Sequence, residues 1–187
     1  MTQSQHRFLR LVRSGVSLVL LTAMLGCLAQ PALAQTSDEC KPIRDVHLFV
    51  QAWNDAVVGR GDRSHACTLR MLTPDARITG VVLGKDGRST RTVELPAEFV
   101  GWYQKHAAET FWERTLHSSV EVYDNVARVT RTYEVRPSAN GPVTATGIED
   151  FQLVLEGGEW KAFAMLWQDA SPGHPLPKRY LPAPAKP

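Results

Sequence analysis

Two long extended segments joined by a glycine pair constrain the fold of this chain more than any other feature. Residues 146–155 and 159–167 are rich in β-branched, aromatic and aliphatic side chains, and Gly157-Gly158 separates them. Glycine readily adopts the positive φ that a tight hairpin turn requires. The pattern therefore predicts an antiparallel hairpin of two long strands near the C-terminus.

Similar turn signals extend this hairpin into a larger sheet. Extended segments are predicted at 76–83, 89–94, 111–123, 126–135 and 143–155. The turns between paired segments are Lys85-Asp86-Gly87, Asp124-Asn125 and Asn140-Gly141. Such short polar turns between extended runs are typical of hairpins. We expect one hairpin followed by a four-stranded antiparallel meander.

Three helices are predicted ahead of the meander. Apolar residues recur at helical spacing between 43 and 57, and Gly59 and Gly61 end that helix. A short helix is expected over 64–72, before a break at 73–75, and Pro96 begins a third. Helices segregated from strands give an α+β domain, whose curled antiparallel sheet must wrap around the N-terminal helix to bury it.

The first 34 residues are typical of a signal peptide. Three arginines precede an apolar run at 16–28, and small residues stand before a cleavage site after Ala34. The run is too short for a membrane span. We predict a periplasmic or secreted protein. A lipoprotein acylated at Cys27 is less favoured, because Met24 and Leu25 depart from the usual lipoprotein motif.

Removal of this leader changes the charge balance. The chain has 21 Lys and Arg against 19 Asp and Glu, and three of the arginines lie in the leader. No basic run remains, so nucleic-acid binding is not expected. The rest divides into a linker at 35–42, one domain at 43–171 and a proline-rich tail at 172–187.

Two cysteines, Cys40 and Cys67, remain after the leader. An even number in an oxidising compartment favours a disulfide. The expected first helix lies between them, so a bridge requires the second helix to fold back. A disulfide and two separate packed thiols both stay open.

Particular residues of the last strands carry a family resemblance. These are Gly147-Ile148, Phe151-Gln152-Leu153, Gly157-Gly158-Glu159-Trp160-Lys161 and Trp167. With the order of elements, they resemble the nuclear transport factor 2-like superfamily, which includes ketosteroid isomerase, scytalone dehydratase and SnoaL-type cyclases. The resemblance runs from about residue 43 to 181. It implies a cone-shaped domain with a pocket at its open mouth, but no single function.

Strand alternation identifies candidate pocket residues. Glu149, Arg131 and Arg114 each fall on a strand face that is otherwise mostly apolar. Glu149 could carry a proton or bind ligand polar groups, with an arginine holding an anionic part of the ligand. Alternatively, Glu149 and Arg131 form a structural pair only. The full candidate set is Trp53, Asn54, Tyr103, Trp112, Arg114, Arg131 and Glu149.

The sequence predicts a small-molecule-binding domain and leaves its ligand open. The alternatives are a cofactor-independent isomerase, dehydratase or cyclase using an inward carboxylate, and a non-catalytic dimerisation module. No histidine spacing typical of a metal site and no cofactor motif occurs. The last strand is apolar on both faces, so a second layer must cover it. A homodimer is expected to do so, and the proline-rich tail is the alternative.

Overall fold

The computed structural model describes residues 40–61 and 63–183. All of these belong to one compact unit, Leu33–Pro187. The predicted signal peptide, Cys27 and residues 35–39 of the predicted linker lie outside the described residues.

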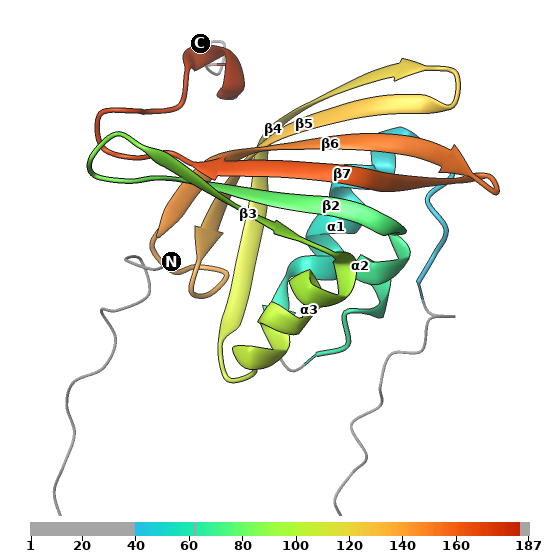
Figure 1. The fold of residues 1–187 in the computed structure, drawn as a ribbon, viewed down its shortest axis with the longest axis horizontal. Coiled ribbons are helices and arrows are strands. Elements are labelled where there is room, and N and C mark those ends of the chain that lie inside the picture. The colour runs from blue at the N-terminus through green and yellow to red at the C-terminus, as the bar shows by residue number, and fades with distance from the viewer. Residues whose placement is uncertain (1–39, 62, 184–187) are drawn as a thin grey trace, which may run out of the picture. The chain divides into compact units, whose positions relative to one another are not determined.

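Helices and strands follow one another in nearly the predicted order (Figure 1). The helical elements are η2 (Val46–Leu48), α1 (Phe49–Val57), α2 (Ala66–Arg70), α3 (Pro96–Lys105) and η3 (Lys178–Tyr180). The strands are β1 (Gly59–Arg60), β2 (Leu72–Leu83), β3 (Ser89–Glu94), β4 (Thr110–Tyr123), β5 (Val126–Arg136), β6 (Ala145–Glu156) and β7 (Glu159–Asp169). The α+β class with three α-helices is confirmed for this part of the chain.

The strands form one seven-stranded sheet in the order β1-β4-β5-β6-β7-β2-β3. The predicted meander is confirmed, since β4 through β7 pair antiparallel in succession. The sheet is mixed and not antiparallel throughout, because β2 lies parallel to β7. The predicted break at 73–75 is instead an irregularity within β2, between Leu72 and Arg77 in the pairing with β7.

Backbone conformation at the turns explains the hairpin signals. Gly157 and Gly158 have φ of 60° and 80° between β6 and β7, and Asp124 has φ of 51° between β4 and β5. Glycine adopts these values without a Cβ penalty, and Asp is among the few other residues that tolerate them. The tight turns hold β4 to β7 in register.

One face of the sheet packs against the helices (Figure 1). We call it the inner face. On β5 and β6 it bears Ala127, Val129, Arg131, Tyr133, Gly147, Glu149, Phe151 and Leu153, all of them buried. Phe151 meets the rings of Phe49 and Trp53 edge-on, at centroid distances of 5.2 and 5.0 Å. These aromatic contacts fix α1 on the inner face.

Cys40 and Cys67 form a disulfide with a Cα–Cα distance of 5.2 Å. Cys67 lies on α2, which packs against α1. Of the two possibilities that the sequence leaves open, the structure has the bridge. It ties the segment before η2 to the helical layer.

The C-terminal tail crosses part of the opposite, outer face. The hydroxyl of Thr132 on β5 donates to the carbonyl of Tyr180 in η3. On β7, Leu166 remains 48% exposed and Phe163 40% exposed. The tail therefore leaves an apolar part of β7 uncovered.

Within residues 40–61 and 63–183, no helix is long and apolar enough to cross a membrane.

Candidate functional site

Arg131 and Glu149 face each other across neighbouring strands. They are paired in the register of β5 and β6, and both lie on the inner face. Arg131 has an exposed fraction of 0%, and Glu149 of 5%. The alternation that selected these two residues is therefore present in the structure, and it brings their side chains into an ion pair.

Four hydrogen bonds and one further ionic contact engage the Arg131 guanidinium. Nε donates to Glu149 Oε2, Nη2 donates to Glu113 on β4, and Nη2 also forms an ion pair with Glu149 Oε2. Nη1 donates to Asn54 Oδ1 at 2.6 Å and to Thr115 Oγ1 at 3.3 Å. All three guanidinium nitrogens are engaged by the protein, and the side chain is fully buried, so Arg131 is not open to a ligand. Arg131 is the centre of a protein-only network.

Two carboxylates share this one cation. The pKa of Glu149 is raised to about 7, because burial raises it most, the attraction of Arg131 offsets only part of that rise, and the Glu113 charge adds to it. Glu113 is more accessible, with its side chain 21% exposed. Because a single guanidinium cannot neutralise both acids, a proton on Glu149 removes the surplus negative charge.

The second oxygen of Glu149 has no partner in the described part of the chain. Both bonds from Arg131 go to Oε2, and Oε1 accepts no hydrogen bond from residues 40–61 or 63–183. Aromatic rings lie close by, because the Arg131 guanidinium is 5.6 Å from the Tyr133 ring centroid and 5.9 Å from that of Phe151. The site thus offers one unpaired carboxyl oxygen beside an apolar wall.

Tyr103 of α3 lies within electrostatic range of this network. Burial raises the pKa of its hydroxyl, and the charges of Glu113 and Glu149 raise it further. Its ring stacks on His65 at 4.4 Å and meets the rings of Phe99, Trp102 and Phe111 nearly at right angles. The hydroxyl therefore stays protonated and can donate a hydrogen bond.

The other four predicted site residues lie in four different surroundings. Asn54 joins the network, and Trp53 is part of the aromatic core, with its ring 6.2 Å from that of Phe99. Trp112 on β4 is half-buried and belongs to neither set of contacts. Arg114 lies on the outer face, where its side chain is 65% exposed and pairs with Glu134.

A bulge in β4 explains the wrong expectation for Arg114. The pairing of β4 with β5 shifts between Thr115 and His117, which reverses the alternation on one side of the shift. Beyond the bulge Val120 packs against the core as expected, whereas before it Glu113 takes the inward place assigned to Arg114. Sequence reasoning missed Glu113. The signal was weak, because two adjacent charged residues do not reveal which of them faces inward.

His65 is a second buried ionisable group that sequence reasoning left aside. It is 4% exposed, and neither ring nitrogen makes a hydrogen bond. Burial lowers its pKa, and the nearby charge of Arg63 lowers it further. A neutral imidazole stacked on Tyr103 is the result.

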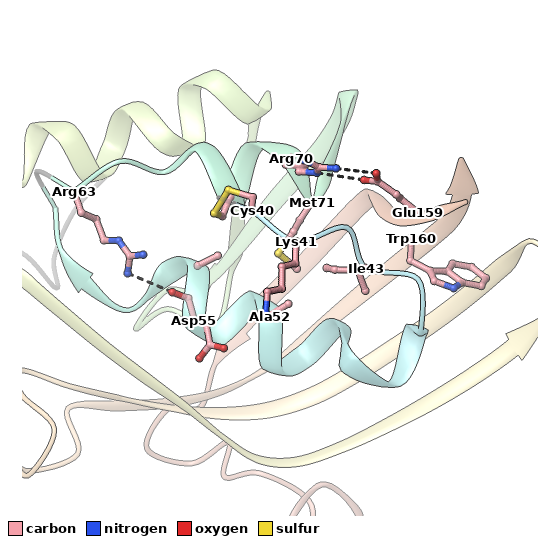
Figure 2. Close-up of a pocket in the computed structure, with 12 residues that line it drawn as sticks. Cys40, Lys41, Ile43, Ala52, Asp55, Arg63, Arg70, Met71, Glu159 and Trp160 are labelled. Carbon is pink, nitrogen blue, oxygen red and sulfur yellow. Dashed lines mark hydrogen bonds and ion pairs between the residues drawn. A yellow bond between two sulfur atoms is a disulfide. The ribbon is translucent and has the colours of Figure 1, made fainter. Parts of the chain in front are cut away.

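Two surface hollows lie apart from this network. One, of about 330 Å³, lies beside the disulfide and α1 (Figure 2), and another, of about 640 Å³, lies between the tail and the outer face. None of the seven predicted pocket residues lines either hollow. Residues 40–61 and 63–183 contain no group of three or more His, Cys, Asp or Glu side chains placed to hold a metal ion.

No protein-family model matches the sequence, and no curated protein matches it. Solved structures do match. A nuclear transport factor 2-like protein of unknown function from Pseudomonas putida is 10% identical, with a TM-score of 0.52 over 66% of this chain and 82% of its own. A Nostoc punctiforme protein of unknown function with a cystatin-like fold is 10% identical, with a TM-score of 0.51 over 71% of this chain and 92% of its own.

A third solved structure, a nuclear transport factor 2-like protein of unknown function from Silicibacter pomeroyi, is 19% identical. Its TM-score is 0.45, over 66% of this chain and 91% of its own. Identities this low are informative about architecture alone. The chain has the nuclear transport factor 2-like fold.

Proposed function

We propose that this chain is an exported domain that binds a small, partly apolar molecule at the inner face of its sheet, next to Glu149. The observation that carries this proposal is the unpaired Oε1 of Glu149 within an otherwise saturated network. Among the described residues, only the two ring nitrogens of His65 are fully buried side-chain atoms without a partner, so Glu149 Oε1 is within reach of solvent. A ligand that bonds to it would replace water there. Tyr103 supplies a second hydrogen-bonding group.

Arg131 has a positioning role in this proposal. It was expected to hold an anionic part of the ligand, but its three guanidinium nitrogens are all engaged by protein side chains. The site also contains two carboxylates for one guanidinium, so it disfavours a further anion. A neutral ligand with a polar group suits Glu149 better.

An acid–base enzyme without a cofactor is the second candidate function. The raised pKa of Glu149, about 7, favours it, because a general acid or base works best with a pKa near the operating pH. Glu149 would then give a proton to the substrate or take one from it, and Tyr103 would donate a hydrogen bond to the oxygen that gains charge.

One substitution separates binder from enzyme. The ligand is first identified by mass spectrometry of small molecules that co-purify with the protein. Glu149→Gln preserves shape and hydrogen bonding but cannot exchange a proton. If the protein only binds, affinity should stay within about tenfold, whereas an enzyme should lose ~100-fold or more in turnover. Glu134→Gln, a buried carboxylate on the outer face, is the matched control.

Two negative results together would contradict both functions. If no small molecule co-purifies, and no compound of a screened library gives a Glu149-dependent shift in melting temperature, Glu149 and Arg131 form a structural pair only.

We also propose export with cleavage after Ala34. The small residues before that position fit a signal-peptidase site better than Cys27 fits a lipoprotein motif. The intact mass of the exported protein should correspond to Gln35 at the N-terminus. A terminus at an acylated Cys27 would contradict this.

A homodimer is proposed to cover the exposed part of β7. Leu166 and Phe163 lie there on the outer face, and exposed large apolar side chains in a cluster favour association. Sedimentation at micromolar concentration should give the mass of two chains, and Leu166→Lys should give one. A monomeric wild-type protein would contradict the homodimer, and the C-terminal tail would then be the only layer over the outer face.

A further inference from the structure

The hollow beside the disulfide is separate from the Glu149 network. Ala52, Asp55 and Ala56 of α1 line it, and their spacing puts them on one side of the helix. Asn54, which bonds to Arg131, lies on the other side. A ligand in this hollow would therefore not touch the inner face of the sheet.

The walls of the hollow combine a buried apolar floor with a charged rim (Figure 2). The floor is formed by the disulfide, whose Cys67 is half-buried, and by four buried residues, Ile43, Ala56, Met71 and Trp160. Its volume of about 330 Å³ is at the lower end of the range for small-molecule pockets. An apolar body of one or two rings is the size that fits.

Among the residues that the structure describes, positive charge is in excess on the rim. Three cationic side chains, Lys41, Arg63 and Arg70, line the hollow with two anionic ones, Asp55 and Glu159. Arg70 forms two hydrogen bonds to Glu159, at 2.8 and 3.3 Å, and lowers the pKa of that carboxyl. This pair is close to neutral, which leaves two cations against one anion.

The remaining charges are not paired with one another. Arg63 donates to the backbone carbonyls of Asp55 and Val58, and within the described residues neither Arg63 nor Lys41 forms an ion pair. Among the described residues, the Asp55 carboxylate accepts a hydrogen bond only from the side-chain amide of Gln51, at 2.9 Å. Figure 2 shows Lys41 between the Arg63 end of the hollow and the Arg70–Glu159 pair.

We propose that this hollow binds a small monoanion with an apolar body, of the aromatic carboxylate class. The apolar part would lie on the floor beside Trp160, and the carboxylate would lie between Lys41 and Arg63. Charge complementarity selects an anion, and the apolar floor selects an organic one over an inorganic one. This site is independent of the function proposed for Glu149.

Benzoate, benzamide and acetate test the two parts of the proposal. Each is titrated into the purified protein, and the indole N–H signal of Trp160, assigned with Trp160→Phe, is followed by nuclear magnetic resonance. Benzoate should shift this signal with millimolar affinity. Benzamide lacks the charge and acetate lacks the ring, so each should bind about tenfold more weakly.

Charge variants give effects of opposite sign. Lys41→Gln and Arg63→Gln should each weaken benzoate binding severalfold, whereas Asp55→Asn removes the unpaired anion and should strengthen it. Lys85→Gln, which changes an exposed cation in the β2–β3 turn, should have no effect. The proposal is overturned if benzamide or acetate matches benzoate, if Asp55→Asn has no effect, or if the Trp160 signal does not respond at tens of millimolar benzoate.

Discussion

Replacing Arg131 with methionine is expected to lower the free energy of unfolding by ~3 kcal/mol or more. Methionine has similar reach and fills the space, but it donates no hydrogen bonds. Glu149 and Glu113 then lose their shared cation, and breaking a buried pair at one partner leaves an uncompensated charge. The pKa of Glu149 should rise further, because only repulsion and burial remain.

Urea unfolding at neutral pH measures this loss. Arg114→Met is the matched control, since Arg114 is exposed on the outer face and its pair with Glu134 should contribute much less. The charge-reversed double variant, Glu149→Arg with Arg131→Glu, should recover little, because the carboxylate introduced at position 131 would face Glu113. A fully stable Arg131→Met variant would contradict the role of Arg131 as the centre of the network.

Removing the disulfide is expected to cost a similar amount. Cys40 and Cys67 are 27 residues apart in sequence, and closing a loop of this length restricts the unfolded chain by about 3.5 kcal/mol. The double variant Cys40→Ser, Cys67→Ser should therefore unfold at a lower urea concentration. The hollow beside α1 should change with it, because both cysteines line it.

Thiol titration provides the control for this prediction. The exported protein should show no free thiol in urea until a reductant is added, and then two. Reduction of the wild-type protein should lower its stability as much as the double substitution does. Two free thiols in the protein as purified would contradict the bridge.

The inner face of β5 and β6 could be predicted because alternation holds without interruption there. The residues two positions before and after Arg131 and Glu149 are apolar, aromatic or small. The two-residue period of a strand therefore predicts by itself that Arg131 and Glu149 face inward. On β4 the same reasoning fails at the bulge after Thr115. A bulge shifts one strand against its neighbour, and the sequence of β4 by itself does not show where that happens.

Pairing between strands that are distant in the sequence could not be predicted either. The parallel contact of β2 with β7 joins segments about 90 residues apart, and no local pattern reports it. The saturation of Arg131 also depends on Asn54 and Thr115, which come from a helix and a different strand. Local patterns therefore revealed which residues face inward, and only the assembled sheet reveals how their bonds are shared.

Both proposed functions depend on Glu149, and a pH titration tests its protonation state most directly. Burial raises the pKa of Glu149 from 4.5, its value in the unfolded chain, to about 7 in the fold. The contribution of Glu149 to stability is therefore complete below pH 4.5 and is lost as the pH rises through about 7. Glu149→Gln stays neutral and should lack that loss.

The decisive measurement is the carboxyl carbon signal of Glu149, followed by nuclear magnetic resonance from acid to mildly alkaline pH and assigned with Glu149→Gln. We expect a midpoint near 7, with the stability of the wild-type protein falling relative to the variant over the same range. A midpoint at or below 4.5 would show that Arg131 keeps Glu149 ionised, and it would contradict a proton held at this site.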